Sequence, residues 1–527
     1  MKVIGAGCGS TCCLINFMGG RYGFCSGAYK LQSPLFSNES CVNFYPEIAE
    51  NPNTISAITL LHTPGLKVDY ALPETAVPAL FTVNGRSFAA GASFYELFAN
   101  GTFTNWGTLN GPPFSPTQIF CCQTHLLILS NGDLFVFVLV PVTDSMGVLH
   151  PANSFIAVNM AQFNGPVLQI DFCDGYFLAA IQNSNTFQVS NLEDGTTWNG
   201  LFISTISYFP DNIVSMKVDH REAWFFSGKK TIAYYNVGAG FPPFIPIQGA
   251  FLEDGSAATF GVVTAKDTIC WIAQDDRGLG TIKMMGSYIG QRISTIPIEI
   301  ALQSYSKISD AVGYSFQLDG HNFLKYRFPS ANVTWVYDFT TSLWHREGFW
   351  NSGTGTYIAH RSTSHMFNFG KHFVGDWMSG NIYETSNSLW DDFGNPIVRE
   401  RAGPNLSASN KWIYFNSVEF LMQMGLGPMP PLLDGNGQPR GPIAMLSWVD
   451  NLSRISNTCY LDCGQAGVTN LRARKVMLGR SRLRQFVLRV SDPVPWAIAD
   501  SFIEATCDGE PIYTSSERMS EQYRKVT

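Results

Sequence analysis

The sequence predicts an all-β protein built around a β-propeller of six or seven blades. Asn-Gly or Asp-Gly occurs thirteen times in 527 residues, and these pairs tolerate the positive φ angles that tight hairpins require. Strand-like runs flank several of the pairs, as in HLLILS-NG-DLFVFVLV, which is typical of two antiparallel strands. The hairpin turns also recur at a regular interval.

These turns lie near residues 85, 132, 175, 228, 277, 320 and 370, so consecutive turns are 43 to 53 residues apart. A period of roughly 40 to 50 residues, with one small antiparallel sheet in each unit, indicates propeller blades. No standard blade signature supports the period. An irregular multi-sheet β protein with evenly spaced hairpins is the alternative.

Composition shifts divide the chain into three expected parts. Residues 1–60 are rich in Gly, Cys and Asn and predict an N-terminal arm, and residues 61–390 hold the repeat. Residues 391–527 predict a β-sandwich-like domain with a Gly/Pro-rich loop at 425–442. Within the repeat, PIEIALQSY predicts a short helix, because Pro297 is tolerated in a first turn and Ile298, Leu302 and Tyr305 share one face.

Overall composition excludes several classes of protein. Charged residues make up 14% of the chain and apolar residues 45%, so disorder driven by charge is excluded. The net charge of −7 argues against a general nucleic-acid coat. The longest apolar run, Leu134–Val142, is far short of the roughly 20 residues of a membrane helix. The N-terminus is too Gly-rich and weakly basic for a signal peptide, so we expect no membrane span and no export.

Charge is distributed unevenly along the chain. Residues 87–216 contain no Lys or Arg. The acidic residues in this segment are Glu96, Asp133, Asp144, Asp171, Asp174, Glu193, Asp194 and Asp211. A basic run without acids follows near the C-terminus, and its cations are Arg472, Arg474, Lys475, Arg480, Arg482, Arg484 and Arg489. The sequence therefore predicts an electrically polarised molecule.

The basic run has three interpretations. With a period of two, Arg480, Arg482 and Arg484 are expected to share one strand face as a cationic ladder, which repels itself unless acids face it. The ladder is a candidate for gripping DNA phosphates. Binding of an acidic protein ring, or of the chain's own acidic half, is equally compatible. A solvated face is the third interpretation.

Cofactor and metal motifs are weak. MKVIGAGCGS resembles the start of a dinucleotide-binding fold, but Ser10 replaces the third glycine and no parallel βαβ pattern follows. Zinc is a weak expectation, because structural sites favour two close pairs with neighbouring His, and small packing thiols are the alternative. The candidate ligands are Cys8, Cys12, Cys13 and Cys25, or Cys459 and Cys463. We expect no cofactor.

A histidine cluster is a further candidate. His360, His365 and His372 with Asp376 have the residue types of a metal or pH-sensing site. A five-residue step along a strand, however, places His360 and His365 on opposite faces. Ordinary polar surface is therefore the preferred interpretation.

A glycosidase is the strongest enzymatic alternative. NLEDGTTW resembles the sialidase Asp-box, with Asn191 in the place of Ser and Glu193 in the place of Asp, but such boxes support turns and are not catalytic. Hydrolysis needs two carboxylates at a defined separation. The acid pairs Asp275/Asp276 and Asp391/Asp392 sit beside Gly-containing turns without a visible orienting partner. We expect a protein that is not an enzyme, with a glycan-binding or glycan-cleaving propeller as the alternative.

Several collinear segments resemble one known family. They include SCVNFYPEIAENP with TPGL downstream (40–66), QVSNLEDGTTW (188–198), VDHREAWFFSG (218–228) and IQGAFLEDGSAA (247–258). Others are QRISTIPIEIALQSYSKISDA (291–311), LDGHNFLKYRFPSANVTWVYD (318–338), FGKHFVGDWMSGNIYE (369–384) and LGRSRLRQFVLRVSDPV (478–494). The chain is similar to the packaged-DNA stabilisation proteins that form the tail nozzle of short-tailed double-stranded DNA bacteriophages. The Cys-rich first 30 residues have no counterpart, and an expected Ser-Asp-Gly-Gly turn is eroded to SWVDNLSRI (447–455).

The resemblance implies a structural virion protein made in the host cytoplasm. It implies a hexamer below the portal and adaptor ring that extends the DNA channel, retains the packaged genome and serves as conduit for its ejection. Tail fibre, tailspike or tail needle proteins are the implied neighbours. A conduit should bind DNA weakly, since each Lys or Arg adds a phosphate contact to break. We therefore expect the segment 87–216 to line the channel and the basic run to support assembly contacts.

Overall fold

A computed structural model of the chain describes residues 20–507, except 52–55, 113–115, 239, 241, 275–277, 279, 429–430 and 454–455. The chain divides into two compact units. We call Gly65–Ser342 with Asn351–Leu389 the propeller unit. The remainder, which comprises the chain up to Pro64, Leu343–Trp350 and the chain from Trp390 onward, is the sandwich unit.

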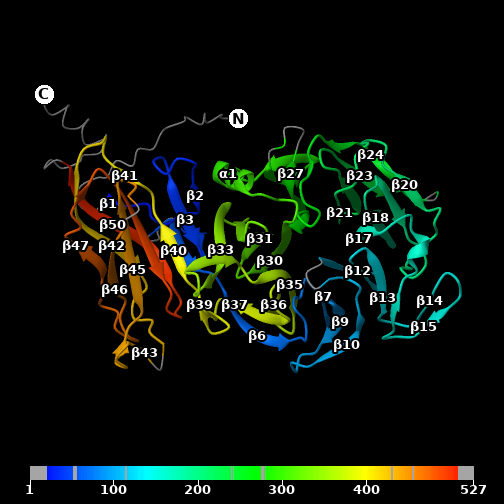
Figure 1. The fold of residues 1–527 in the computed structure, drawn as a ribbon, viewed down its shortest axis with the longest axis horizontal. Helices are drawn as coiled ribbons and strands as arrows, with labels where there is room; N and C mark the ends of the chain where they lie inside the picture. The colour runs from blue at the N-terminus through cyan, green and yellow to red at the C-terminus, as the bar shows by residue number, and fades with distance from the viewer. Residues whose placement is uncertain are drawn as a thin grey trace. The chain divides into compact units, whose positions relative to one another are not determined.

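Among the described residues of the propeller unit, seven blade sheets have innermost strands that form a closed ring (Figure 1), and β14 (Val142–Thr143) and β15 (Leu149–His150) form a separate two-stranded sheet. Each inner strand lies beside the next, and the last lies beside the first. In ring order they are β7 (Ala79–Val83), β11 (Thr117–Cys121), β17 (Val167–Cys173), β21 (Ser215–Asp219), β26 (Val263–Ala265), β30 (Val312–Leu318) and β35 (Ser362–Asn368). The predicted β-propeller is confirmed, and its blade number is seven.

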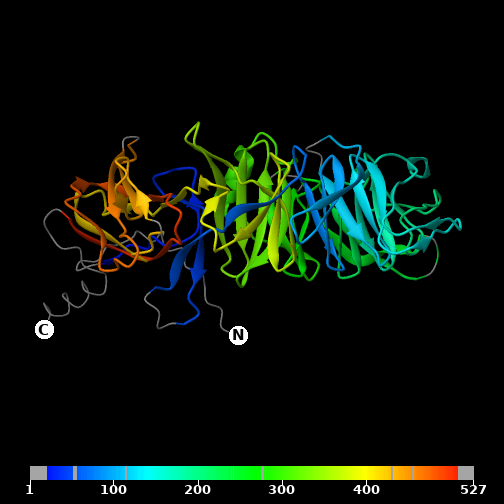
Figure 2. The same ribbon diagram turned by 90° about the horizontal axis from the view of Figure 1, so that it is seen from below.

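The other strands complete each sheet outward from the ring, and Figure 2 shows the same blades from the side. Blades one to three add β8 (Arg86–Ala90), β9 (Ser93–Leu97) and β10 (Phe103–Thr108); β12 (His125–Ser130), β13 (Asp133–Val138) and β16 (Phe155–Ala157); and β18 (Tyr176–Ile181), β19 (Thr186–Val189) and β20 (Ile203–Thr205). Blades four to seven add β22 (Glu222–Phe226), β23 (Thr231–Asn236) and β24 (Phe244–Leu252); β25 (Gly255–Ser256), β27 (Thr268–Gln274), β28 (Thr281–Gly286) and β29 (Ile289–Arg292); β31 (His321–Phe328) and β32 (Val333–Asp338); and β36 (Lys371–Asp376), β37 (Asn381–Ser386) and β6 (Gly65–Ala71).

The ring closes by pairing the two ends of the unit. β6, the first strand of the unit, lies antiparallel to β37, with Asn381 opposite Ala71 and Ser386 opposite Gly65. The seventh blade thus takes its outer strand from the start of the unit. Backbone hydrogen bonds between distant segments therefore hold the propeller closed.

The predicted tight turns are confirmed where Asn-Gly or Asp-Gly joins two strands. Both residues have positive φ at Asn84, Asn131, Asp174 and Asp319 and at the glycines that follow them. The regular spacing nevertheless arises from turns at different blade positions. The turns at Asn131 and Gly228 join second and third strands, whereas those at Asn84, Asp174 and Asp319 join first and second strands. The turn expected near Arg277 lies outside the described residues.

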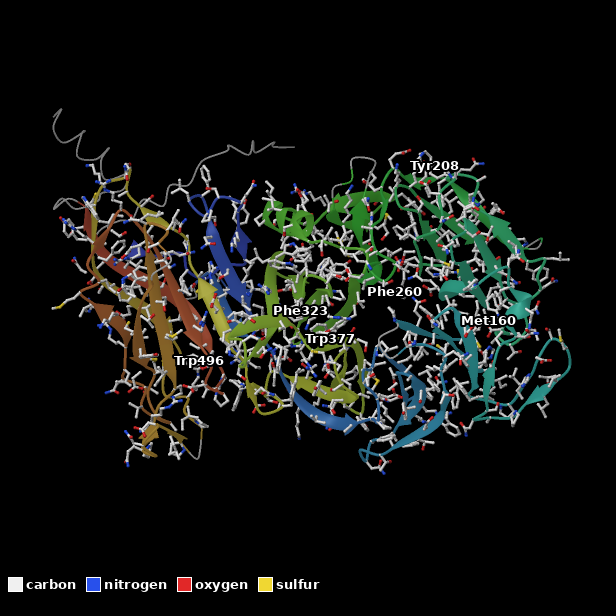
Figure 3. All side chains as sticks on the ribbon, viewed as in Figure 1. Met160, Tyr208, Phe260, Phe323, Trp377 and Trp496 are labelled. Atoms are coloured by element: carbon white, nitrogen blue, oxygen red, sulfur yellow. The ribbon has the colours of Figure 1, made fainter. Side chains whose placement is uncertain are left out.

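Clusters of buried apolar side chains join neighbouring blades, and Figure 3 shows all the side chains on the ribbon. Phe88 and Phe94 of the first blade pack with Phe137 of the second, and Phe187 stacks on Phe225 across the third and fourth at 4.3 Å between ring centroids. Each fully buried ring of this kind contributes roughly 1.5 to 3 kcal/mol.

The predicted helix is confirmed as α1 (Ile296–Ser304). Pro297 lies in its first turn, and Ile298 and Leu302 are buried. Tyr305 caps the C-terminal end, and its backbone N–H donates to the Leu302 carbonyl.

The sandwich unit consists of two sheets around one core, as expected for the predicted β-sandwich-like domain. The first contains β4 (Phe44–Ile48), β5 (Ile58–His62), β50 (Ala497–Cys507), β42 (Ile413–Met422) and β47 (Ala473–Val476), with β1 (Gly20–Arg21) and β48 (Arg480–Ser481) at its margins. The second contains β33 (Leu343–Asn351), β3 (Asn38–Val42), β40 (Arg399–Ala402), β49 (Leu483–Val490), β45 (Ile443–Asp450) and β46 (Ser456–Asp462), with β2 (Tyr29–Lys30) and β41 (Leu406–Ser407). Residues 20–60 of the expected arm thus contribute strands here, and β5 continues to His62. The Gly/Pro-rich segment contains the hairpin of β43 (Leu432–Leu433) and β44 (Pro439–Arg440).

A buried arginine ties the N-terminal strands to the sandwich core. Arg401 on β40 is fully buried and donates to the carbonyl oxygens of Phe24, Gly27 and Ser40 at 2.7 to 3.2 Å. It also forms an ion pair with Glu39 at 2.5 Å. Trp496, labelled in Figure 3, is buried in the same core.

Candidate functional site

A cavity of about 650 Å³ lies among the seven inner strands of the propeller unit. Lys217 reaches it beside Phe120, with its Nζ 4.8 Å from the ring centroid and 3.2 Å from Asp171 Oδ2. Arg327 also lines the cavity and stacks on Trp377 at 4.9 Å, and burial lowers its pKa to about 10. A cavity of this volume lies within the range of about 300 to 1,000 Å³ that is typical of small-molecule pockets, which is too small for a passing DNA duplex. The propeller's own centre is therefore not a DNA passage.

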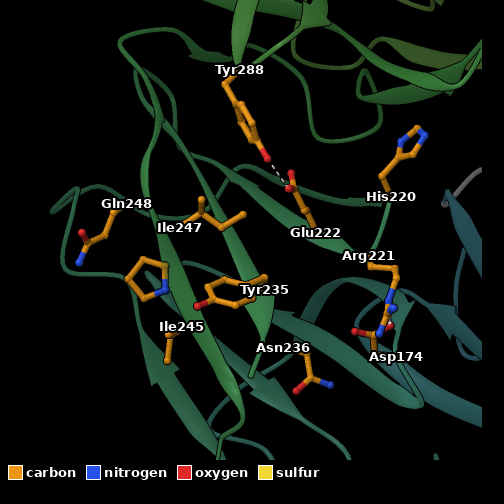
Figure 4. A pocket seen from close by; sticks show the side chains of 11 residues that line it. Asp174, His220, Arg221, Glu222, Tyr235, Asn236, Ile245, Ile247, Gln248 and Tyr288 are labelled. Carbon is orange, nitrogen blue, oxygen red and sulfur yellow. Dashed lines mark hydrogen bonds and ion pairs between the residues drawn. The ribbon is translucent and has the colours of Figure 1, made fainter. Parts of the chain in front are cut away.

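A second hollow of about 650 Å³ lies over the fourth blade (Figure 4). Glu222 accepts a hydrogen bond from the hydroxyl of Tyr288 at 2.5 Å, and this bond raises the pKa of Tyr288. Arg221 donates through Nε to Asp174 at 2.6 Å. Each carboxylate in this hollow is thus already committed to a neighbour. The glycan-cleaving alternative needs an acid and a nucleophile or base free to act on substrate, and this arrangement does not provide them.

The Asp-box-like turn is held by Asp194, and the prediction that Glu193 takes the Asp role is wrong. Asp194 accepts hydrogen bonds from the backbone N–H and hydroxyl of Thr196, from Thr197 and from the backbone N–H of Ser145. Burial alone would raise its pKa, but these hydrogen bonds outweigh burial and lower it. The turn supports a strand connection, as expected for such boxes.

Of the eight acidic candidates for channel lining, Glu96, Asp171 and Asp194 are buried. Their predicted role as free channel-lining charges is wrong. Glu96 accepts from Arg86 Nε at 2.7 Å, and Asp171 pairs with Lys217, so the cations flanking the Lys/Arg-free segment neutralise acids inside it. The remaining candidates are the half-buried Asp133, Asp144, Asp174 and Glu193 and the exposed Asp211. For these five the channel role stays a prediction.

The basic run does not form one ladder. Arg480 on β48 pairs with β42 of the first sheet, whereas Arg484 on β49 belongs to the second sheet and is 1% exposed. The chain changes sheet between them, so the predicted shared strand face is wrong. Arg484 donates to Asp450 at 2.6 and 2.8 Å inside the core.

Other cations of the run pair with acids of the sandwich unit. Arg472 pairs with Glu419, Arg474 with Glu504 at 2.7 Å and Arg489 with Glu400. Lys475 is half-buried on β47. Arg480 and Arg482 differ because both are exposed and lie over Trp412, at 4.7 and 4.9 Å from its ring centroid. The sequence pattern of charges did not indicate this aromatic partner.

The histidine candidates separate into a pair and a single residue. His365 Nε2 and His372 Nδ1 lie 3.1 Å apart on neighbouring strands, and burial lowers the pKa of His365 to about 3. His360 is buried and contacts Ser362 Oγ through Nδ1, so ordinary polar surface is wrong for this residue. Asp376 accepts from Arg361 and Tyr383. Within the described part of the chain, no group of three or more His, Cys, Asp or Glu could hold a metal ion.

The cysteine candidates divide by position. Burial raises the pKa of the Cys25 and Cys463 thiols to about 12 and also raises that of Cys459, which favours packing thiols over metal-binding thiolates. Cys8, Cys12, Cys13 and the remainder of the MKVIGAGCGS segment lie outside the described residues. So do Asp275 and Asp276, whereas Asp391 and Asp392 form the short strand β38.

Several solved structures share weak similarity with the chain. The extracellular domain of a one-component system from B. thetaiotaomicron has 9% identity and a TM-score of 0.37, over 76% of this chain and 48% of that one. PorZ of the Porphyromonas gingivalis type-IX secretion system has 10% identity and a TM-score of 0.34, over 67% and 44%. This chain therefore spans less than half the length of either structure. The WD40 domain of Toxoplasma gondii coronin has 10% identity and a TM-score of 0.34, over 65% and 85%.

These scores are too low to support a functional inference. Comparison with curated protein sequences gave no match. Across the parts of the chain that the structure describes, no helix has the length and apolar character to cross a membrane.

A family model matches most of the chain. The match runs over residues 22–389, which include every blade of the propeller and the first strands of the sandwich unit. The family's β-propeller description agrees with the closed ring of seven sheets described above. The chain belongs to the phage stabilisation family described as Bacteriophage P22 Gp10, beta-propeller.

Proposed function

We propose that this phage structural protein forms a hexameric tail nozzle below the portal and adaptor ring of a short-tailed double-stranded DNA phage. In this role it retains packaged DNA, conducts the genome during ejection, and contacts tail fibre, tailspike or tail needle proteins. The observation that carries the proposal is the family match over residues 22–389. The site geometry supports a structural role, since the carboxylates of the fourth-blade hollow are engaged with neighbouring side chains.

The distribution of cations supports a conduit. The segment 87–216, without Lys or Arg, includes the first blade beyond Arg86 and the whole of blades two and three. Arg86 at the start of β8 is paired with Glu96, so a surface of these blades offers few cationic contacts to phosphates and DNA sliding past it releases few counterions. We propose that the DNA passage lies between copies of the chain, with the first three blades facing it. The propeller's own cavity is too small for this purpose.

A phage genome lacking this reading frame tests the proposal. We expect particles that package DNA but lose it, so that genome protection from added nuclease falls sharply and purified full-length chain restores it. As control, particles are complemented with Arg221→Gln, whose exposed side chain lies in the fourth-blade hollow. Normal tails and full nuclease protection without the chain would overturn the proposal.

A further inference from the structure

An exposed surface of the sandwich unit has the composition of a protein interface. The guanidinium groups of Arg480 and Arg482 both lie over Trp412, and Arg480 also lies 6.0 Å from the Tyr414 ring centroid. Tyr, Trp, Met and Arg are the residues enriched at interface cores and binding hot spots. Met477, which is 91% exposed, follows the strand that pairs with β42. We call Trp412, Tyr414, Met477, Arg480 and Arg482 the aromatic–arginine surface.

A groove of about 1340 Å³ adjoins this surface at Trp412 and Arg482. Its apolar walls include Leu35, Phe36 and Leu452, of which Phe36 is 78% exposed. Asn405 donates to the carbonyl oxygens of Pro34 and Leu35 at 2.7 and 3.2 Å. These hydrogen bonds attach the segment before Phe36 to the loop that contains Asn405.

Two apolar residues of this region adopt backbone conformations that favour glycine or asparagine. Leu452 has φ +59° and Met477 has φ +57°, in the left-handed region that is unfavourable for side chains of this size. Both side chains are exposed. Strained residues of this kind often mark functional positions.

The two arginines also retain uncompensated charge. Four other cations of the basic run are paired with Glu419, Glu504, Asp450 and Glu400. Within the described ranges, Arg480 and Arg482 have aromatic partners and no ion pair to an acid. Stacking on Trp412 orders both guanidinium groups while leaving their charges available. The complementary partner surface is therefore apolar and acidic.

The propeller unit exposes such a surface on the hairpin of β14 (Val142–Thr143) and β15 (Leu149–His150). Met146 is 76% exposed and Leu149 66%, and Val148 is also exposed. Asp144 organises the hairpin turn by accepting from the backbone N–H groups of Met146 and Val148 at 2.9 and 2.8 Å. We call Asp144, Met146, Val148 and Leu149 the hairpin patch.

The hairpin patch is rigidly mounted and lies in an acidic environment. Ser145 at its turn donates through its backbone N–H to Asp194 and contacts Thr197, so the hairpin is fixed to the Asp-box-like turn of the next blade. The surrounding segment 87–216 has no Lys or Arg. The local negative charge comes from Asp144, which also pairs with His150 at 2.9 Å, and from the half-buried Glu193 beside Asp194. The patch thus combines bulky apolar side chains with negative charge, which complements the aromatic–arginine surface.

We infer that the aromatic–arginine surface of one copy binds the hairpin patch of the next copy, an inference that rests on the ring proposed above. Two different surfaces on each copy make a heterologous contact, which generates a closed ring when the rotation closes. The apolar side chains of the hairpin patch enter the groove beside Trp412. Arg480 and Arg482 face the acidic surroundings of the hairpin.

Native mass measurement of the purified full-length chain tests this inference with two double variants. Arg480→Ser with Arg482→Ser removes the free cations, and Met146→Ser with Leu149→Ser removes the apolar tip of the hairpin. Each is expected to raise the dissociation constant of self-association by about 30-fold or more, the loss typical of a hot spot. Both variants change exposed side chains, and thermal unfolding at the wild-type temperature verifies that each remains folded.

Matched controls change the same residue types elsewhere. Arg472→Ser removes an exposed arginine that pairs with Glu419, and Ile289→Ser with Phe367→Ser removes exposed apolar side chains of the fifth and seventh blades. Both controls are expected to assemble as the wild type does. A ring lost equally in the controls would overturn the inference.

A mixing experiment identifies the partner surface. The two defective double variants each retain one intact surface, so an equimolar mixture is expected to form dimers that cannot grow into a ring. Absence of these dimers, or a ring that survives either double variant, would overturn the inference while leaving the ring proposal intact. A monomeric wild-type chain at concentrations found in assembling tails would overturn both.

Discussion

Replacing Asp194 by Ala should destabilise the propeller unit far more than replacing its neighbour Glu193. Asp194 is buried and accepts from two backbone N–H groups of the turn, at 2.8 Å from Thr196 and 3.3 Å from Thr197, and from Ser145 N–H at 3.1 Å. Hydrogen bonds to a charged group are worth about 1.5 to 3 kcal/mol each. The hydroxyl donors can bond to water instead, and the energies of the individual hydrogen bonds are not additive. We therefore expect the free energy of unfolding to fall by about 3 to 5 kcal/mol.

Urea unfolding measures this loss, with an expected midpoint shift of roughly 1 to 2 M. Hydrogen exchange of peptides spanning the hairpin turn and residues 194–198 should accelerate in the same variant, since Asp194 joins the two segments. Glu193→Ala is the matched control. Its Oε2 is buried without a hydrogen-bond partner, so this substitution breaks no hydrogen bond at that oxygen and should not lower the free energy of unfolding.

The pH dependence provides an independent check on Asp194. Hydrogen bonding holds its pKa below the ordinary value in the folded state. The contribution of Asp194 to the free energy of unfolding is therefore present above the pKa that this carboxyl has in the unfolded chain. It is lost as the pH falls through the lower pKa of the folded state. Asp194→Ala should lose less stability in acid than the wild type does. Equal destabilisation by Glu193→Ala and Asp194→Ala would refute the assignment of the turn to Asp194.

Three further predictions concern other parts of the molecule. Arg401→Met leaves Glu39 without its cation in the sandwich core. A urea titration should show a free energy of unfolding lower by about 3 to 5 kcal/mol, and an unchanged value would contradict the role of this buried pair. Burial lowers the pKa of His125 to about 4. The free energy of unfolding should therefore be fully retained above about pH 6.5 and should fall between pH 6.5 and 4. His125→Gln should flatten this part of the curve of unfolding free energy against pH. Asn164→Lys, Leu201→Lys and Asp211→Lys add cations to exposed positions of the first three blades and the segment that follows them. They should slow genome ejection in a single-particle assay and steepen the salt dependence of the ejection rate by about 0.9 per phosphate contact. Ile289→Lys, at an exposed position outside these blades, should change neither.

The repeat could be predicted from sequence because short-range turn chemistry determines it. Asn-Gly and Asp-Gly pairs adopt positive φ at low cost, so turns such as Asn84 and Asp319 can be identified from two letters. His220-Arg221 and Lys266-Asp267 adopt positive φ at equivalent turns without that signal. The inferred period was therefore assembled from non-equivalent turns, although its blade number lay within the correct range.

The candidate sites were harder to predict because charge in a sequence does not report burial. Glu96 and Asp171 appear as free acids in the Lys/Arg-free segment, but flanking cations neutralise both inside the blades. Arg484 appears equivalent to Arg480 and Arg482 by spacing. A change of sheet between β48 and β49 places Arg484 in the core and leaves the other two exposed.

The sequence by itself determined an all-β chain with evenly recurring hairpins, a Lys/Arg-free segment and a basic C-terminal run, because turn geometry and composition depend on adjacent residues. Tertiary structure alone decided that β6 closes the ring against β37, across more than 300 residues. It also decided that Asp194 and not Glu193 holds the hairpin, and that Trp412 orders Arg480 and Arg482. Such contacts depend on strand register and on which face is buried, and a one-residue shift reverses both.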